Sequence, residues 1–298
     1  MGEFVVFLFA GLTVGAINAL TGLGLLIIYN VTGVINFAQG DFVMLGAMGT
    51  ILFAGPNGGP HRLPLAVAVI VTVAGVAAIG GLVERAVIHP RRGKGPILLL
   101  MITVGLSLVI EGVVLIVTSS QTYGLRNFSA GGPLTVFGGE VSRQSLWVYG
   151  VTALVLIALY LFFSHTRSGK AFRACEINPL AARLVGIRPS RYWTYAFALA
   201  AGVSALAGAA IAPVTTATYN MGLPLALDGF VAWVLGGLVS PVGVVLGGIG
   251  LGVAQGMLDG YLPTALLPYS GAFPFLVMVV VLVARPGGLV QLLPNRRV

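Results

Sequence analysis

The chain has 298 residues, of which 57% are hydrophobic and 8% are charged, and its formal net charge is +8. Because a soluble domain carries roughly 25% charged residues, this composition excludes a soluble globular protein. The apolar runs are long and lack two-residue alternation, so they favour membrane-spanning helices over a closed barrel.

Nine apolar segments follow one another along the chain, and Pro and Gly clusters separate several of them. They predict an all-α polytopic membrane protein with about eight to ten transmembrane helices. No stretch indicates a separate soluble domain, so we expect residues 1–298 to form one transmembrane domain. The segments are 4–28, 37–54, 64–88, 96–119, 145–163, 193–213, 223–239, 242–260 and 268–284.

The main polar interruption is the basic segment, residues 164–192, which has the sequence SHTRSGKAFRACEINPLAARLVGIRPSRY. Basic residues in short loops mark the cytoplasmic side of a membrane protein. With nine crossings and the N-terminus outside, only Arg62, Arg126 and Arg143 fall outside. We therefore expect the basic segment and the C-terminus to be cytoplasmic. The residues on that side are Arg85, Arg91, Arg92, Lys94, Arg167, Lys170, Arg173, Arg183, Arg188, Arg191, Arg285, Arg296 and Arg297.

Within the basic segment, helix signals surround residues 180–185. Asn178 suits an N-cap, Pro179 suits the first helical position, and Gly186 suits the C-terminal stop. A helix of two turns is marginal in water, so it must pack on another surface. Its apolar face packs either on its own membrane domain or in a groove of a peripheral subunit, and the residues alone leave both open.

Two irregular segments, 29–45 and 214–240, indicate re-entrant or broken helices. They belong to short matches about 186 residues apart: Ala19-Leu20-Thr21-Gly22 with Ala205-Leu206-Ala207-Gly208, and Asp41 with Asp228. The second copy would run in the opposite sense, as in an inverted repeat whose interrupted helices line the transport path. Such matches also arise by chance in apolar sequence, so both interpretations stay open.

Glycines at positions 248, 252 and 256 share one face of the eighth apolar segment. This spacing lets two helix backbones approach closely. Packing within the subunit is the favoured interpretation, and an interface between two chains is the alternative.

Three acids lie within or beside apolar segments, where ionisable groups are costly and default to functional candidates. Glu111 lies well inside the fourth segment and must face protein or water. Asp41 and Asp228 lie at the ends of the irregular segments, where each could cap a helix N-terminus or line the path.

No enzyme signature is present: the chain lacks GxSxG, HExxH and a Walker-type Gly-Lys-Ser/Thr motif. His61, His89 and His165 lie at loop edges and form no ligand pattern. Cys175 is the single cysteine, which excludes an internal disulfide and a multi-cysteine metal site. We expect no catalytic residue and no metal site, so any ATP that drives this protein is bound by another chain.

Several motifs, in order and nearly from end to end, resemble the permease subunits of bacterial branched-chain amino acid ABC transporters, specifically the H-type member of the permease pair. They are Gly11-Leu12-Thr13-Val14-Gly15-Ala16 with Ala19-Leu20, Val34-Ile35-Asn36-Phe37-Ala38-Gln39-Gly40-Asp41-Phe42, Glu84-Arg85, Ile102-Thr103-Val104-Gly105-Leu106-Ser107, Phe172-Arg173-Ala174, Asn178-Pro179, Gly186-Ile187, Met221-Gly222-Leu223-Pro224 and Arg285-Pro286-Gly287-Gly288-Leu289. One departure is Glu111-Gly112, where we expect an amide pair of the Gln-Asn type, and it bears on the choice of substrate.

The resemblance implies a permease of the bacterial inner membrane that imports branched-chain amino acids or a related small solute by alternating access. Its expected partners are two ATP-binding subunits, a second homologous permease or a second copy of itself, a periplasmic solute-binding protein and membrane lipid, but no nucleic acid. No cofactor is expected on this chain, since ATP is used by the partner subunits.

The resemblance also assigns candidate roles to residues. The ATPase-coupling residues would be Arg173, Glu176, Asn178, Pro179, Ala182, Arg183 and Gly186. The substrate path would be lined or gated by Asn36, Gln39, Asp41, Phe42, Glu111 and Asp228. The rival hypotheses are an ion-coupled secondary transporter that uses Asp41, Glu111 and Asp228, and a membrane scaffold that moves no solute.

Overall fold

The computed structural model describes residues 2–55, 63–129, 131–285 and 287–288. Of the residues used above, His61, Arg62, Pro286, Leu289, Arg296 and Arg297 lie outside these ranges. Within them, regular structure is almost entirely helical, as predicted for an all-α polytopic membrane protein.

Nine apolar helices match the nine predicted segments in the part of the chain that the structure describes. Six are long and apolar enough to cross a membrane: α1 (Gly2–Thr32), α3 (Leu65–Val83), α4 (Pro96–Thr118), α5 (Arg143–His165), α8 (Pro189–Ile211) and α10 (Pro241–Tyr261). Helix α3 continues into a π-helix, η2 (Glu84–Ile88), and a 3₁₀ turn, η3 (His89–Arg91). The three shorter helices are α2 (Gln39–Ala54), α9 (Gly222–Leu235) and α11 (Phe273–Ala284), the last preceded by the 3₁₀ turn η4 (Leu267–Ala272).

The short helices α2 and α9 lie at the centre of the bundle; α9 falls within the predicted irregular segment 214–240, whereas α2 begins within the segment 29–45 and extends beyond it. With 16 and 14 residues they extend about 24 and 21 Å, less than the hydrocarbon thickness of about 30 Å. The backbone that leads into α2 is irregular yet buried at Val34, Asn36 and Ala38. Irregular backbone at membrane depth is tolerated only where protein or a cavity surrounds it.

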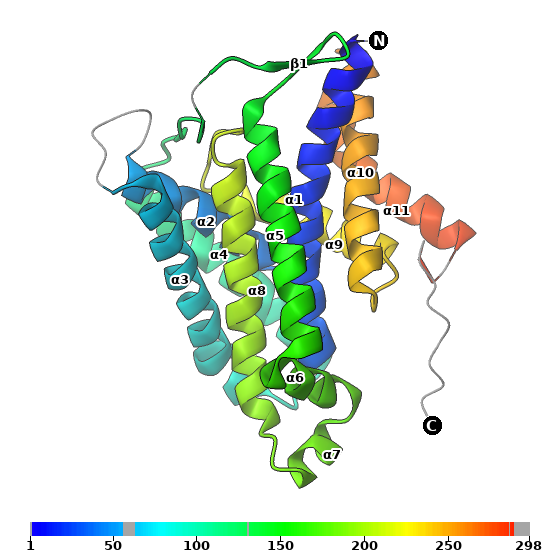
Figure 1. Ribbon diagram of the computed structural model, residues 1–298. Helices are drawn as coiled ribbons and strands as arrows, with labels where there is room; N and C mark the ends of the chain where they lie inside the picture. Colours follow the sequence, from blue (N-terminus) through cyan, green and yellow to red (C-terminus); the bar gives the residue numbers. More distant parts are fainter. Residues whose placement is uncertain (1, 56–62, 130, 286, 289–298) are drawn as a thin grey trace.

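The arrangement of the helices supports the inverted repeat (Figure 1). Helices α1 and α3 descend in this view, whereas α8 and α10 rise. Helix α1 packs against α9 and α10, and α8 packs in the same way against α2 and α3. Gly22 of α1 lies against the backbone of Gly229 in α9, and Gly208 of α8 lies against the backbone of Val43 in α2. The unit of α1, α2 and α3 and the unit of α8, α9 and α10 therefore make equivalent contacts with each other.

The glycine stripe of α10 packs within the subunit, as the favoured interpretation predicted. Gly248, Gly252 and Gly256 face Ala19, Gly15 and Gly11 of α1, and a Cβ on Gly248 would come 2.6 Å from the Ala19 nitrogen. Because each stripe consists of small residues spaced four apart, the two backbones approach closely along several turns.

Two features were not predicted from the sequence. A small antiparallel hairpin of β1 (Leu134–Val136) and β2 (Gly139–Val141) covers the N-terminal end of α1. At the opposite end of the bundle, α5 leads into α6 (Arg167–Ile177) and the short helix α7 (Pro179–Leu184), which precede α8 (Figure 1). The basic segment therefore forms two helices rather than one helix in a loop.

Candidate functional site

Thr166 is the N-cap of helix α6, and its side-chain oxygen accepts a hydrogen bond from the Gly169 backbone nitrogen at 2.9 Å. Its buried face contains Ala171, Phe172 and Cys175. The Phe172 ring packs edge-on against aromatic rings of α5 and α8, with its centroid 5.2 Å from that of Tyr192. This face fixes α6 to the ends of α5 and α8.

Burial raises the pKa of the Cys175 thiol, so it stays protonated. A buried, protonated thiol is a poor nucleophile, so Cys175 serves as a small packing residue of α6.

Helix α7 has the ends that the sequence predicted. The Asn178 side-chain oxygen accepts hydrogen bonds from the backbone nitrogens of Leu180 and Ala181, both at 3.0 Å. Pro179 occupies the first helical position. Gly186 follows the helix with a φ of +81°, a left-handed conformation in which glycine is not strained. The local caps thus define a two-turn helix independently of the membrane domain.

The apolar residues of α7 point away from the bundle. Ala182 is buried at 3% exposure and is the contact of this helix with the core. By contrast, Leu180 is 71% exposed, Leu184 is 89% exposed and Val185 is 75% exposed. Of the two alternatives left open by the sequence, packing of this apolar face on the chain's own membrane domain is therefore limited to Ala182.

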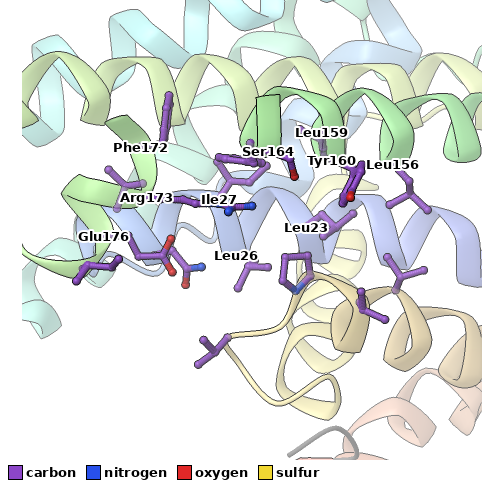
Figure 2. A pocket seen from close by; sticks show the side chains of 18 residues that line it. Leu23, Leu26, Ile27, Leu156, Leu159, Tyr160, Ser164, Phe172, Arg173 and Glu176 are labelled. Carbon is purple, nitrogen blue, oxygen red and sulfur yellow. The ribbon is translucent and has the colours of Figure 1, made fainter. Parts of the chain in front are cut away.

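The predicted coupling residues Arg173 and Glu176 line a groove of about 660 Å³ between α1, α5, α6 and the start of α10. In Figure 2 the side chains of Leu23, Leu26 and Leu159 form apolar walls, and Arg173 and Glu176 lie together at one end. Although the Glu176 side chain is exposed, the surrounding walls desolvate it and raise the pKa of its carboxyl, while Arg173 acts in the opposite direction. The predicted coupling residues therefore divide between this groove and the exposed helix α7.

At the centre of the bundle, Gln39 connects α2 to α8. Its amide nitrogen donates to the Ala200 carbonyl at 3.0 Å and to the Ser204 hydroxyl at 2.6 Å. The Asn36 amide nitrogen lies 3.5 Å from the Gln39 side-chain oxygen, and both side chains are fully buried. These two predicted path residues thus form one polar cluster at the start of α2.

Asp41 lies in the first turn of α2 and is also fully buried. Neither carboxylate oxygen has a hydrogen bond of ordinary geometry, but Ser107 and Glu111 of α4 are close enough to act on it electrostatically. Glu111 is only partly exposed, so it faces protein as expected rather than open lipid. Asp41 and Glu111 therefore lie within electrostatic range of each other.

The same face of α4 carries a polar seam. The Thr103 hydroxyl accepts from the Phe37 backbone nitrogen at 3.3 Å and lies 3.2 Å from the Ile35 carbonyl, so it faces the irregular backbone before α2. Thr103, Ser107 and Glu111 are spaced four apart, which places them on one face of the helix. Polar side chains thus connect α4 to the backbone that precedes α2 and to the start of α2.

Asp228 has different partners. It lies seven residues into α9 and accepts a hydrogen bond of 3.4 Å from the Gln255 amide of α10, whose oxygen accepts from Asn18 of α1 at 3.1 Å. The prediction that Asp228 could cap a helix N-terminus is therefore wrong, because the N-cap position of α9 is Met221. Asp41 does not cap α2 either, because the N-cap position is Ala38 and no side chain caps it. The positions of both acids depend on where the short helices begin, which composition does not reveal.

Phe42 packs in an apolar cluster with Val76, Ala201 and Ala205, between α2, α3 and α8. It is fully buried there, and its gating role stays a prediction. Sequence reasoning missed Ser204, Ser107 and Gln255, which contact the predicted residues. Small polar residues inside apolar segments were the available signal for them.

No group of three His, Cys, Asp or Glu side chains that could hold a metal ion occurs among the described residues.

Comparison with known proteins gives a consistent result over nearly the whole chain. Residues 7–282 match the family model described as branched-chain amino acid transport system / permease component. No solved structure matches the chain.

Curated relatives cover almost the full length. The chain is 28% identical to the high-affinity branched-chain amino acid transport system permease protein LivH of Escherichia coli (strain K12), covering 96% of each chain. It is 29% identical to the permease protein BraD of Pseudomonas aeruginosa, covering 94% of this chain and 93% of BraD. It is 27% identical to a probable LivH of Methanocaldococcus jannaschii, covering 91% of this chain and 87% of that protein. The family model and the length of these matches agree, and the chain belongs to the family of permease components of branched-chain amino acid transport systems.

Proposed function

We propose that this chain is one transmembrane permease subunit of an ATP-driven ABC importer for branched-chain amino acids or a related small solute. Its relatives are named as permeases of high-affinity branched-chain amino acid transport systems, which supports the amino acid as substrate class. In this proposal a periplasmic binding protein delivers the solute, two separate ATP-binding subunits hydrolyse ATP, and a second permease or a second copy completes the path. This chain itself binds no cofactor.

The observation that carries the proposal is the exposed apolar face of α7. Leu180, Leu184 and Val185 stand at one end of the bundle on a capped helix whose only buried residue is Ala182. Apolar side chains exposed together on a rigid element mark an interaction site. The exposed residues around this face include Arg183 and Arg188 as well as Ile177, and we infer a protein partner in the aqueous phase for it. We assign that partner as an ATP-binding subunit.

The orientation belongs to the same proposal. In it, the chain lies in a bacterial inner membrane with the N-terminus outside and the C-terminus in the cytoplasm. The basic residues of the segment 164–192 and of the turn after α3 lie at the end of the bundle that carries α7. The excess of basic residues in these loops favours the cytoplasm for that end.

The path would pass along the start of α2, where Asn36, Gln39, Asp41 and Glu111 gather. ATP binding and hydrolysis in the partners would displace α7, and the bundle would alternate between two packings that expose this region to opposite sides. The ion-coupled alternative uses the same acids, but the family match supports the importer over it.

Reconstitution in proteoliposomes tests the proposal. The chain, with its ATP-binding subunits, second permease and binding protein, should take up leucine only when ATP is inside and the binding protein is outside. Uptake by this chain alone, driven by a proton or sodium gradient, would refute the importer. Thermal-shift measurements on the binding protein with amino acids, urea and short amides would identify the solute.

A further inference from the structure

A buried carboxylate lies at the end of α3, where the helix changes its hydrogen-bond pattern. Glu84 is the first residue of the π-helix η2, and its side chain is fully buried. A buried charge is costly unless it is paired and hydrogen-bonded. Single π-helical turns inside longer helices are rare and occur frequently at functional sites. The burial of the Glu84 carboxylate at this position therefore indicates a structural or functional role.

Both carboxylate oxygens of Glu84 have partners. One accepts from the Arg92 guanidinium, and the other accepts from the Thr194 hydroxyl at 2.5 Å. His89 adds its Nδ1 atom 3.4 Å from the first oxygen. Glu84, Arg92 and Thr194 are called the Glu84 clamp below.

Arg92 extends the contact to the first turns of α8. The Arg92 guanidinium also donates to the Ser190 carbonyl at 3.3 Å and lies over the Trp193 ring, 3.9 Å from its centroid. Burial lowers the pKa of the Arg92 guanidinium, and the nearby Glu84 carboxylate opposes this effect. Ser190, Trp193 and Thr194 all belong to α8. The clamp therefore joins the end of α3 to the start of α8.

The clamp lies between α7 and the centre of the bundle. Four residues separate the end of α7 from the start of α8, and Arg183 of α7 acts electrostatically on Arg92. About 15 Å further along α8, Ala200 and Ser204 hold the Gln39 side chain of α2. Helix α8 thus contacts the clamp near one end and the predicted path at its middle.

We propose that the Glu84 clamp makes α3 and α8 move as one body, so that a displacement of α7 reaches α2 rather than only bending the start of α8. Glu84 is then a positioning residue for energy coupling. This inference rests on the proposed function for its coupling role, but not for the mechanical link itself. An apolar pair of the same volume would hold the two helices together equally well. The charged contact of Glu84 with Arg92 and Thr194 also fixes the orientation of α3 relative to α8.

The first experiment tests the mechanical link in the lone permease, in lipid nanodiscs. Spin labels at Arg85 and Arg191, which are both exposed, report the separation of the ends of α3 and α8. With the unmodified clamp, the distribution of distances between the two labels should be narrow, and Glu84→Gln and Thr194→Val should broaden this distribution. Thr194→Ser, which keeps the hydroxyl, should restore the narrow distance. An unchanged distribution in Glu84→Gln, or equal broadening in Thr194→Ser, overturns the clamp.

The second experiment tests coupling in the assembled importer. Glu84→Gln should lower the amount of solute moved per ATP hydrolysed by about fivefold or more, while ATP hydrolysis continues. The matched control is Arg85→Gln, which removes an exposed charge from the neighbouring position and should leave the ratio unchanged. A normal ratio in Glu84→Gln overturns the coupling role, and so does failure of both Glu84→Gln and Thr194→Val to assemble, since the contact would then be purely structural. If the unmodified importer moves no solute with ATP, the proposed function fails. The distances between the spin labels then still show whether the clamp links α3 to α8.

Discussion

Helices α8 and α4 have the same length, 23 residues, but opposite environments. Fourteen residues of α8 are buried, whereas only Leu99, Thr103, Ser107, Val114 and Thr118 of α4 are buried. Yet α4 is the more hydrophobic of the two. Hydropathy therefore ranks these helices in the reverse order of their burial.

The physical reason is that lipid tails are as apolar as leucine, so apolar side chains gain little by leaving lipid for protein. Close packing of small residues and polar contacts between helices hold the interior instead. Helix α8 is rich in alanine and has Gly208 against the α2 backbone, and Ser204 binds Gln39. Helix α4 exposes large side chains such as Ile97 and Ile116, which suit lipid or a second permease.

Substituting a large residue for one glycine in each helix tests the difference between α8 and α4 most strongly. At Gly208 a Cβ would come 2.8 Å from the Ala47 backbone nitrogen, so Gly208→Leu should force α2 away and destabilise the protein by at least about 3 kcal/mol. At Gly105 of α4 a Cβ meets nothing within 4 Å, so Gly105→Leu should change stability by less than about 1 kcal/mol. Thermal unfolding in detergent, followed by size-exclusion chromatography, measures both. Equal stability of the two variants would contradict the assignment of α8 to the interior.

Polar contacts give a smaller, sharper test. Gln39→Leu removes two hydrogen bonds to α8 and leaves the Ser204 hydroxyl without that partner, so it should cost about 1–3 kcal/mol and reduce uptake. Ser107→Ala on α4 removes a hydroxyl that makes no such contact with α8, and its cost should stay below about 1 kcal/mol. The same unfolding assay, paired with leucine uptake, compares them. A larger loss for Ser107→Ala would reverse the proposed ranking of the two helices.

The smallest effect on stability is expected where α7 precedes α8. Asn178→Ala removes the cap and should weaken α7 locally by about 1 kcal/mol, leaving global unfolding unchanged but lowering ATP-dependent uptake. Asn178→Asp keeps the cap and should retain uptake. The corresponding position before α4 is Gly95, which provides no side-chain cap, and Gly95→Ala should leave ATP-dependent uptake unchanged. Normal uptake by Asn178→Ala would show that α7 need not be preformed.

Features set by local signals were predictable from the sequence. The nine apolar segments and the ends of α7 depend on neighbouring residues, and Asn178, Pro179 and Gly186 marked those ends correctly. Helix α6 was missed because its basic residues suggested a loop, although Thr166 and the spacing of Phe172 and Cys175 were available signals.

Features set by distant contacts were not predictable. The contact between Gln39 and Ser204 joins residues 165 positions apart. Asp228 was expected at a helix end and lies inside α9, because the start of this short helix is fixed by packing around α1, α2 and α10. The electrostatic influence of Glu111 on Asp41 likewise depends on how α4 lies against α2. A single sequence carries no direct signal for such placements.

We propose that α7, and not the exposed surface of α4, contacts the ATP-binding subunits. Leu184→Cys and Ile116→Cys place a thiol at positions that are 89% and 80% exposed, on α7 and α4 respectively. The native Cys175 is buried and protonated, so it should contribute little background. With a short thiol-to-amine cross-linker in the assembled importer, we expect cross-linking of position 184, and not of position 116, to an ATP-binding subunit. Absence of a cross-link from position 184, or an equal yield from position 116, would contradict it.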